Sequence, residues 1–336
     1  MKCVEQMSVG KPSEVLRCVE RPQPVPAAGE VLVRMLASPV NPSDLMFVQG
    51  VYGTQPQLPQ TPGFEGVGIV EASGGGLRGK LFCGKRVAVL NKAGGNWAQY
   101  AVLPAQQVIP LSSQLSVEEA ATFFVNPATA WIMTQEVLRI PRGEFLLQTA
   151  AASSLGKMIV RLSAAMGFQT INVVRHEKSA SDLKAIGAKH VIVFDPAKDS
   201  ADTLRKQVSS VTGQAGIKYA IDPVGGATAS AVLNVLGMGG RMLVFGTLCD
   251  EPMNISPRIL MVQQVSLEGF WLGNFMNRKS LLFKLRLVKK ITRLIRDRVL
   301  STDIASTFGL DQIEEAVTQS AAPGRQGKTL IKISAA

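Results

Sequence analysis

Histidine and cysteine are scarce in this sequence, and their positions exclude several kinds of site. Its 336 residues include two histidines, His176 and His190, and four cysteines that are scattered without any CxxC pair. Such spacing argues against a structural zinc site and against a disulfide framework. Both histidines lie in the second half of the chain. The first half therefore cannot use histidine as an acid, a base or a metal ligand.

Long apolar runs are also missing. A helix that spans a bilayer needs about 20 consecutive apolar residues, and the most apolar stretch, residues 120–133, is interrupted by Asn126 and Pro127. No basic segment followed by an apolar one opens the chain, so no secretory signal is expected. We expect a soluble, cytoplasmic protein with no membrane partner.

Aromatic residues make up only 6% of the chain, whereas its formal charge is +11. A basic surplus suits anionic partners such as phosphorylated cofactors or acidic carrier proteins. The charge is not gathered in a tail and few rings are available to stack on bases, so nucleic-acid binding is not expected. The densest basic stretch, residues 278–298, has apolar residues at helical spacing, including Leu281 and Leu285. This pattern predicts an amphipathic surface helix.

The order of the expected elements indicates two domains. Short apolar runs bounded by Gly, Pro and Asn predict a β-rich first part with strands at residues 31–37, 66–71, 86–90, 98–102 and 107–110. From about residue 117, strands and helices alternate, which predicts an α/β fold with a parallel, doubly wound sheet. Its strands are expected at 145–148, 170–174, 191–194, 218–221 and 241–245, and its helices at 155–166, 181–186 and 228–236. The tail from residue 300 to 333 is expected to rejoin the first domain.

The first strand of the α/β part ends at Gln148 and runs into Thr149-Ala-Ala-Ala-Ser-Ser-Leu-Gly156. A tight turn from a strand into a helix presents free N–H groups and the positive end of the helix dipole, which favours a pyrophosphate. The usual GxGxxG is absent, but small residues still permit close approach, and Ser153 or Ser154 can cap the helix. A packed turn with an ordinary helix cap remains the alternative.

The same serines superficially resemble the nucleophile elbow of a serine hydrolase. That mechanism needs an acid and then a late histidine downstream of the serine. His176 and His190 both follow within one strand–helix unit. A serine hydrolase is therefore a remote alternative.

The next strand discriminates between nicotinamide cofactors. An NAD-binding domain places Asp or Glu about twenty residues beyond the turn to bind the ribose 2′-hydroxyl. Here the strand ends in Arg175-His176-Glu177-Lys178. Arg175 would bind a 2′-phosphate through charge-assisted hydrogen bonds, so NADPH is the expected cofactor. The alternative is a solvated surface arginine.

Tyr52 is the candidate for acid chemistry in the first part. It lies in the loop Gln49-Gly-Val-Tyr-Gly53, whereas Tyr100 and Tyr219 lie in apolar runs typical of strands. The alternative is that Tyr52 only lines a pocket.

Three segments of the first part carry a family resemblance: Asn41-Pro-Ser-Asp44, the tyrosine loop, and Pro62-Gly-Phe-Glu-Gly-Val-Gly68. Together they resemble the medium-chain dehydrogenase/reductase superfamily. Zinc-dependent members carry Cys where Asn41 stands and His where Phe64 stands. A catalytic zinc ion needs three protein ligands, so the resemblance implies a metal-free site here.

Within that superfamily the chain resembles the mitochondrial-type 2-enoyl thioester reductases, through residues 125–130, 170–175, 222–226 and 269–272. This resemblance implies a GroES-like catalytic domain, residues 1–122 with 299–336, and a Rossmann NADP-binding domain, residues 123–298. It assigns Tyr52 as the catalytic residue. It places cofactor contacts at Asn126, Ala152, Ser153, Ser154, Leu155, Arg175, His176, Glu177, Phe245, Gly246, Thr247, Leu248, Phe270, Trp271, Leu272, Gly273 and Lys328.

The turn departs from the family pattern, since Ala152 and Ser154 replace Asn and Gly. His176 and Glu177 also depart from a more basic family sequence, so selectivity for NADPH rests mainly on Arg175. Trp271 either packs beside the substrate or belongs to the core.

The resemblance predicts NADPH-dependent reduction of the 2,3 double bond of a trans-2-enoyl thioester, without zinc, in fatty acid metabolism. The acyl group would be carried by coenzyme A or by an acyl carrier protein, and the enzyme would be a homodimer. An NADPH:quinone or 2-alkenal oxidoreductase on the same scaffold is the nearer alternative. A non-catalytic NADPH-binding protein is the more remote one.

Overall fold

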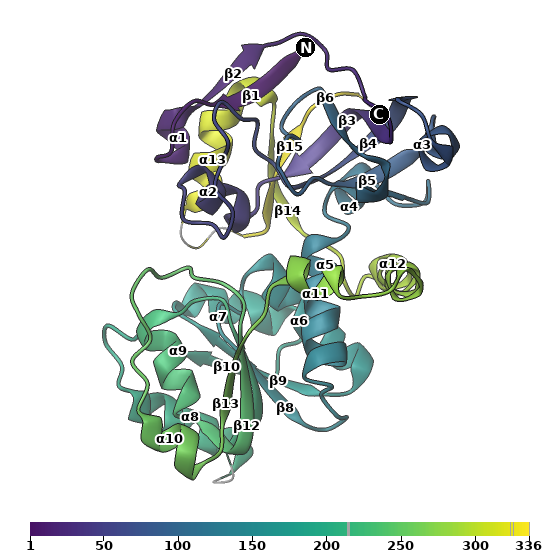
Figure 1. The fold of residues 1–336 in the computed structure, drawn as a ribbon. Coiled ribbons are helices and arrows are strands. Elements are labelled where there is room, and N and C mark those ends of the chain that lie inside the picture. The colour runs from purple at the N-terminus through teal and green to yellow at the C-terminus, as the bar shows by residue number, and fades with distance from the viewer. Residues whose placement is uncertain (214–215, 323, 325, 336) are drawn as a thin grey trace. The chain divides into compact units, whose positions relative to one another are not determined.

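A computed structural model describes every residue except 214, 215, 323, 325 and 336. The chain forms two compact units, residues 1–125 with 302–336 and residues 126–301. The division into a catalytic and a cofactor domain after residues 122 and 298 stays a prediction. Figure 1 shows the yellow C-terminal elements lying among the purple N-terminal ones in the first unit.

The first unit is built on a seven-stranded sheet. Its order is β14-β15-β3-β4-β5-β7, and β6 pairs with β3. A separate hairpin pairs β1 with β2. The strands are β1 Lys2–Gln6, β2 Leu16–Glu20, β3 Glu30–Pro39, β4 Glu65–Ser73, β5 Arg86–Leu90, β6 Tyr100–Pro104, β7 Val108–Pro110, β14 Ile304–Phe308 and β15 Lys328–Lys332. The tail rejoins this unit because β15 pairs antiparallel with β3.

The helices of the first unit are short. They are α1 Pro12–Val15, α2 Pro42–Val48, α3 Leu77–Phe82, α4 Val117–Ala121 and α13 Ile313–Ala321, with 3-10 turns at Ala105–Gln107 and Leu310–Gln312. Alternate apolar residues of β3 and β5, such as Val31 and Val33, pack in a buried cluster, because alternate side chains of a strand share one face. The strand predicted at 98–102 in fact begins at Tyr100. Ala98 instead forms an isolated bridge with Cys3.

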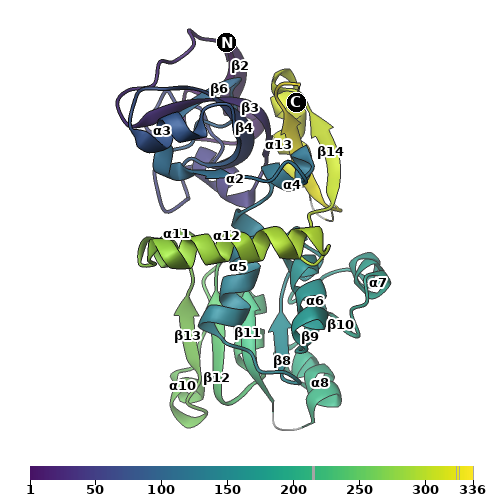
Figure 2. The same ribbon diagram turned by 90° about the vertical axis from the view of Figure 1, so that its right-hand side faces the viewer.

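The second unit is a parallel α/β sheet whose strand order is β10-β9-β8-β11-β12-β13 (Figure 2). Its strands are β8 Phe145–Gln148, β9 Gln169–Val174, β10 His190–Val193, β11 Ile217–Asp222, β12 Leu236–Val244 and β13 Ser266–Gly269. Its helices are α6 Ser154–Met166, α7 Glu177–Ala185, α8 Ala201–Thr212, α9 Gly226–Leu233, α10 Pro257–Val262, α11 Leu272–Asn277 and α12 Leu281–Arg296. Helix α5, Val125–Trp131, begins at the boundary and continues as a π-helix over Ile132–Val137. The predicted fold class is confirmed.

Three predicted helices differ in detail. The helix predicted to reach residue 236 ends at Leu233, because Leu236 already begins β12. The helix expected at 181–186 begins earlier, at Glu177. The amphipathic stretch becomes α12, but Leu281 and Leu285 are 55% and 59% exposed. Its buried face is formed by Ile291 and Ile295, which belong to the predicted apolar stripe, together with Leu287 and Leu294.

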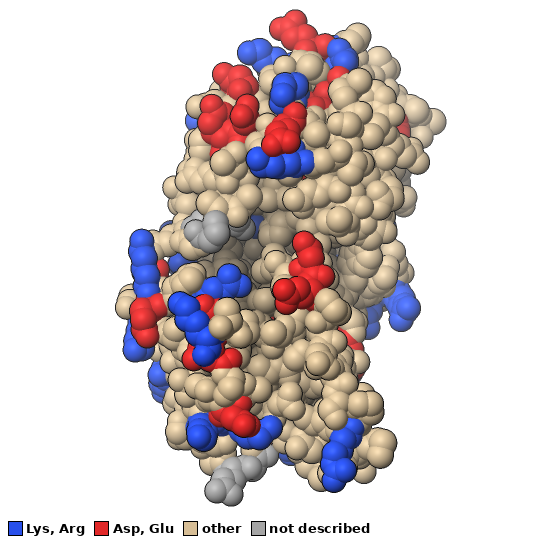
Figure 3. Space-filling model, turned by 90° about the vertical axis from the view of Figure 1, so that its left-hand side faces the viewer, with Lys and Arg blue, Asp and Glu red and all other residues tan. Residues whose placement is uncertain are grey.

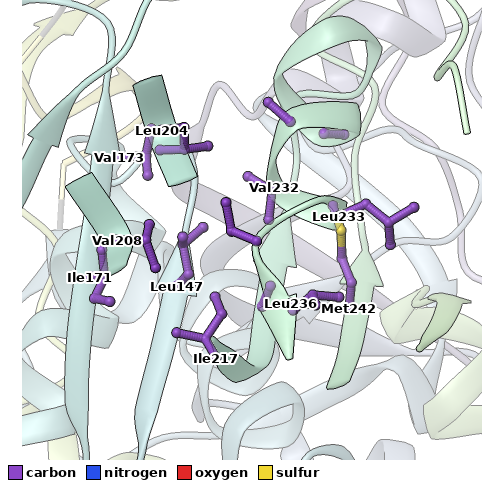
Figure 4. Packing of buried hydrophobic residues seen from close by; sticks show 14 of the residues in the cluster. Leu147, Ile171, Val173, Leu204, Val208, Ile217, Val232, Leu233, Leu236 and Met242 are labelled. Atoms are coloured by element: carbon purple, nitrogen blue, oxygen red, sulfur yellow. The ribbon is translucent and has the colours of Figure 1, made fainter. Parts of the chain in front are cut away.

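Apolar packing holds the parallel sheet against α8 and α9. Leu147, Ile171 and Val173 from the strands pack in one buried cluster with side chains of these helices, including Leu204 and Val232 (Figure 4). Burying a side chain of this size contributes about 1.5–3 kcal/mol. This layer fixes the strands, and so fixes the position of the loops at their carboxyl ends.

Lysine and arginine side chains are interspersed with acidic ones on the face drawn in Figure 3. On that face the basic surplus does not form one continuous patch. No helix among the described residues is long and apolar enough to cross a membrane.

Candidate cofactor and catalytic sites

The predicted pyrophosphate turn lies at the point in the parallel sheet where the order of successive strands reverses. β8 pairs with β9 on one side and with β11 on the other. In doubly wound sheets, ligands bind outside the carboxyl ends of the strands at such a switch point. The turn at 149–153 follows the carboxyl end of β8, so its location matches a nucleotide site.

The turn is held by backbone bonds and a helix cap. Ala150 has a positive φ of 46°, and the N–H of Ala151 donates to the Val173 carbonyl at 3.2 Å. The Ser153 hydroxyl caps α6 by accepting from the Gly156 N–H at 3.1 Å. Ser154 is the first residue of this 13-residue helix. The N–H groups of the first helical turn lack partners within the helix, and they can bind an anion.

Gly156 has a role that was not predicted from the sequence. A Cβ atom at this position would lie 2.3 Å from the Ala151 carbonyl oxygen. Only glycine therefore permits the helix to start so close to the turn. The chain has lost the first two glycines of the fingerprint but retains the one needed for helix–strand packing. Gly156 is the last residue of the turn segment 149–156, where the GxGxxG pattern has its third glycine, and this position was the clue in the sequence.

A chain of buried amides lies beneath the turn. The Gln148 side chain donates to the Gly156 carbonyl at 3.1 Å and to Asn172 Oδ1 at 2.7 Å. Asn172 in turn donates to the His190 carbonyl at 2.9 Å. These bonds tie β8, β9 and β10 together at the edge where the cofactor is expected.

Asp222 anchors the opposite side of the turn. It is fully buried at the end of β11, and it accepts from the Thr149 hydroxyl and from the Gly225 N–H. Burial raises the pKa of this carboxyl, and the hydrogen bond from Thr149 opposes the shift. From the sequence, Asp222 was assigned no role beyond its place in a family segment. An acid at the end of a buried strand was the signal for its role.

Arg175, His176 and Glu177 are exposed at the carboxyl end of β9. β9 runs parallel to β8 with Asn172 opposite Gln148, so these residues lie at the same edge as the turn. His176 precedes α7 and Glu177 is its first residue. An arginine and a carboxylate therefore stand side by side where the sequence predicts the 2′-phosphate.

The other predicted cofactor segments follow β12 and β13 at this edge. The N–H of Phe245 donates to the Asp222 carbonyl at 2.9 Å, and that of Phe270 to the Val244 carbonyl at 2.8 Å. A Cβ atom on Gly246 would lie 2.8 Å from the Pro223 carbonyl oxygen, so the chain makes a second close approach here. Trp271 is 41% exposed. The alternative that Trp271 is a core residue is wrong.

Two predicted site residues lie in the first unit, and Tyr52 is one of them. It is half-buried in the segment between α2 and β4. Its ring centroid lies 5.5 Å from that of Phe64, which packs edge-on to Phe47 at 5.0 Å. Phe64 stands where zinc-dependent members of the resembled superfamily carry a histidine. The ring of Tyr52, the candidate phenol, therefore packs against the residue at that position.

The second is Lys328, which takes part in a buried polar cluster with Asn41, Asp44 and Glu65, all of them less than 5% exposed. Lys328 Nζ donates to Asn41 Oδ1 at 2.6 Å. Asp44 accepts from the N–H groups of Asn41 at 2.7 Å and Phe64 at 3.0 Å. Burial raises the pKa of Asp44 to about 7, and it also raises that of Glu65. From the sequence, neither Asp44 nor Glu65 was assigned a role. Their place among apolar neighbours was the signal.

The donor set of this cluster does not suit zinc. Asn41 and Phe64 supply an amide and a hydrocarbon ring where the ligands would stand, and Lys328 already engages the Asn41 oxygen. Outside residues 214, 215, 323, 325 and 336, no three His, Cys, Asp or Glu side chains gather as a metal site would require.

The structure thus gathers most predicted cofactor residues, from the turn at 152–155 to 270–273, at one edge of the second unit. Asn126 is half-buried in α5, the first residue of that unit. Tyr52 and Lys328 belong to the first unit. That Tyr52 meets a bound nicotinamide stays a prediction.

Two family models match the chain. One, described as an alcohol dehydrogenase GroES-like domain, matches residues 27–113, and the other, described as a zinc-binding dehydrogenase, matches residues 154–286. Among curated proteins, the chain is similar to the mitochondrial enoyl-[acyl-carrier-protein] reductase of Homo sapiens. The two are 31% identical over 327 residues, which cover 96% of this chain and 86% of the relative. The enzyme of the same name from Caenorhabditis elegans is 29% identical over 310 residues, 88% of this chain and 87% of the relative.

Solved structures include similar folds. A Bacillus thuringiensis structure assigned as an NADPH:quinone reductase is 30% identical, with a TM-score of 0.89 and coverage of 98% of each chain. The Escherichia coli quinone oxidoreductase, solved in complex with NADPH, is 24% identical with a TM-score of 0.89, covering 99% of this chain and 100% of that one. The latter likeness concerns the fold alone.

Proposed function

Because this chain belongs to the medium-chain dehydrogenase/reductase superfamily, we propose that it is an NADPH-dependent, zinc-independent enoyl reductase that reduces the 2,3 double bond of a trans-2-enoyl thioester. The observation that carries the proposal is the contact of Tyr52 with Phe64. A phenol stands beside the position where zinc-dependent members place a ligand. The curated relatives, at 29–31% identity, bear the name of this activity.

The edge of the second unit suits a dinucleotide. The turn offers N–H groups at the start of α6 that lack partners within the helix, and Gly156 and Gly246 let the backbone pass close to Ala151 and Pro223. In this proposal, the first turn of α6 binds the pyrophosphate, and the loops after β12 and β13 bind the nicotinamide half.

Arg175 supports NADPH rather than NADH. Its guanidinium is exposed at the end of β9, where it can form charge-assisted hydrogen bonds with a 2′-phosphate. Glu177, two residues away, opposes a second negative charge, so we expect the preference for NADPH to be moderate.

Bound NADPH would supply the hydride that adds to the β-carbon of the acceptor. As that carbon is reduced, negative charge develops on the thioester carbonyl oxygen, and a preorganised donor aimed at this oxygen lowers the barrier. The Tyr52 hydroxyl is the proposed donor, and it delivers the proton to the α-carbon. The aromatic contact with Phe64 would hold the phenol in place, since such ring pairs contribute about 0.5–1.5 kcal/mol.

A quinone reductase is the second candidate, because the 30% identical Bacillus thuringiensis structure is assigned that activity. A quinone also accepts hydride and develops charge on an oxygen, so the same residues would serve. NADPH oxidation should be followed with trans-2-enoyl-CoA, an enoyl group on acyl carrier protein, a 2-alkenal and a small quinone, each at equal concentration. A kcat/KM that is higher for the quinone than for both thioesters would contradict the enoyl reductase proposal. Bound NADPH without turnover of any acceptor would favour a binding protein.

We also propose a homodimer. β13 is an edge strand, and Met238, Met261 and Val262, in the neighbouring elements β12 and α10, are 57–74% exposed. An open edge flanked by apolar side chains suits pairing with a second copy. Light scattering would test the assembly. The cytoplasmic location stays a prediction to be tested by fractionation, because the curated relatives are named as mitochondrial enzymes.

A further inference from the structure

Glu65 has an unusual set of partners for a carboxylate in the interior of a protein. It lies at the start of β4 and is 3% exposed. Its Oε1 atom accepts from the N–H groups of Phe124 at 2.8 Å and Val125 at 2.7 Å. A buried charge persists only when it is paired or hydrogen-bonded, and two backbone donors meet this need at one oxygen.

Those two amides lie where α5 begins. Val125 is the first residue of α5, and Phe124 immediately precedes it. The first N–H groups of a helix have no partner within it. Glu65, some sixty positions earlier in the chain, therefore acts as the cap for α5. The next residue along this helix is Asn126, a predicted cofactor contact.

The second oxygen of Glu65 is connected through Asn41 to Lys328, another predicted cofactor contact. Oε2 accepts from Asn41 Nδ2 at 3.4 Å, and Asn41 Oδ1 accepts from Lys328 Nζ at 2.6 Å. The amide of Asn41 thus presents its nitrogen to the carboxylate and its oxygen to the ammonium. Reversing that amide would set its N–H group against the Lys328 ammonium, so the charge on Glu65 determines which way Asn41 faces.

We propose that Glu65 is a positioning residue that holds Asn126 and Lys328, one through the start of α5 and the other through Asn41. The idea rests on the proposed function, because the family resemblance places both residues among the contacts to NADPH. Glu65 itself touches neither substrate nor cofactor. Its task is to fix the backbone at Phe124 and Val125, where α5 begins, and the amide of Asn41, the partner of Lys328.

The Glu65→Gln variant separates the two branches. A glutamine keeps one oxygen for the amides of Phe124 and Val125, but its NH₂ group then faces the Asn41 NH₂ group. Asn41 must turn, and its N–H group would then oppose the Lys328 ammonium. The cap survives while the link to Lys328 breaks. The Glu65→Ala variant loses both. Glu71→Gln is the matched control, since Glu71 lies on the same strand, β4, and pairs at the surface with Arg34.

The test measures the Kd for NADPH, kcat, KM and the hydrogen-exchange rates of the Phe124 and Val125 amides in the full-length protein. For Glu65→Gln we expect the Kd for NADPH to rise at least fivefold, with slow exchange at both amides. For Glu65→Ala, exchange at these amides should become at least tenfold faster. Glu71→Gln should match the wild type in all measurements.

A Glu65→Gln protein with a lower Tm but an unchanged Kd would show a structural role only and would overturn the proposal. Asn41→Leu gives a second test of the link to Lys328 should Glu65→Ala fail to fold, because it cuts this link and leaves Glu65 bonded to the start of α5. It should raise the Kd as Glu65→Gln does, and an unchanged Kd would count against the proposal. Wild-type protein that fails to bind NADPH would refute the proposed function, whereas fast wild-type exchange at the two amides would refute the network alone.

Discussion

The two units build their candidate sites from different materials. In the second unit the site consists mainly of backbone groups at a sheet edge, held by Gly156, Asp222 and a chain of amides. In the first unit it consists of side chains: Tyr52 on Phe64, and a buried cluster around Glu65. A backbone site survives changes of side chain, which explains how the turn can lose two fingerprint glycines. A site of side chains depends on their identity.

The buried acids of the first unit provide the largest test of this contrast. Burial raises the pKa of Asp44 from its ordinary value of 3.8 to about 7. The folded protein therefore binds a proton more tightly than the unfolded chain, and its free energy of unfolding falls as the pH rises from about 4 to about 7. The loss is at most about 4 kcal/mol at 1.36 kcal/mol per pKa unit. Asp44→Asn should flatten the dependence measured by urea unfolding at several pH values.

Glu118→Gln is the control for that experiment, because this acid of the first unit is exposed. It should keep the wild-type pH dependence. If Asp44→Asn kept it too, Asp44 would not be the group that titrates.

Gly156→Ala tests the backbone site. The added Cβ would meet the Ala151 carbonyl oxygen at 2.3 Å, so the turn and the start of α6 must separate. We expect a loss of roughly 2–3 kcal/mol in stability, in the range for overpacked sites, and weaker NADPH binding. Thermal unfolding with and without NADPH measures both. Gly269→Ala, where no atom lies within 4 Å of the added carbon, should behave as the wild type.

Tyr52→Phe removes one hydroxyl from the side-chain site. A positioned general acid contributes about 10²–10⁴-fold, so kcat should fall at least about tenfold while the Kd for NADPH is kept. Stopped-flow turnover and a binding titration measure the two quantities. Tyr100→Phe, in β6, serves as control. A kcat equal to that of the wild type would remove Tyr52 from the mechanism.

Arg175→Ala should have the smallest effect, because this side chain is exposed and water screens its charge. We expect the KM for NADPH to rise about tenfold, at the lower end of the range for hydrogen bonds to charged groups, and the KM for NADH to stay nearly the same. Lys178→Ala, an exposed cation in α7, is the control. An equal change for both cofactors would argue against a 2′-phosphate contact.

Much of the second unit was predictable from local pattern. The strand at 145–148 and the helix beginning near residue 155 follow from a short apolar run, a turn of small residues and a serine cap, and all three signals act over a few residues. The limits of β12 were harder to predict, because Leu236 suits a helix or a strand equally. Pairing with β11 decides between the two. The exposure of Leu281 and Leu285 likewise depends on how α12 packs.

The candidate sites divide in the same way. The roles of Arg175 and Ser153 could be predicted from the sequence, because Arg175 follows the end of a strand and Ser153 precedes a helix. Those of Glu65 and Asp44 could not, because their partners lie elsewhere along the chain. Apolar neighbours indicate that such an acid is buried, but only the fold supplies the partners that give it a role.

The order of residues by itself determined the α/β alternation, the serine-capped turn, the arginine after the second strand and the tyrosine loop, since each depends on neighbours within one element. Tertiary structure alone decided that Asn41, Glu65 and Lys328, the last 263 positions beyond Glu65 in the numbering, share one buried hydrogen-bonded cluster. Charges are stable in an apolar interior only when partners surround them, and those partners come together only when β15 pairs with β3.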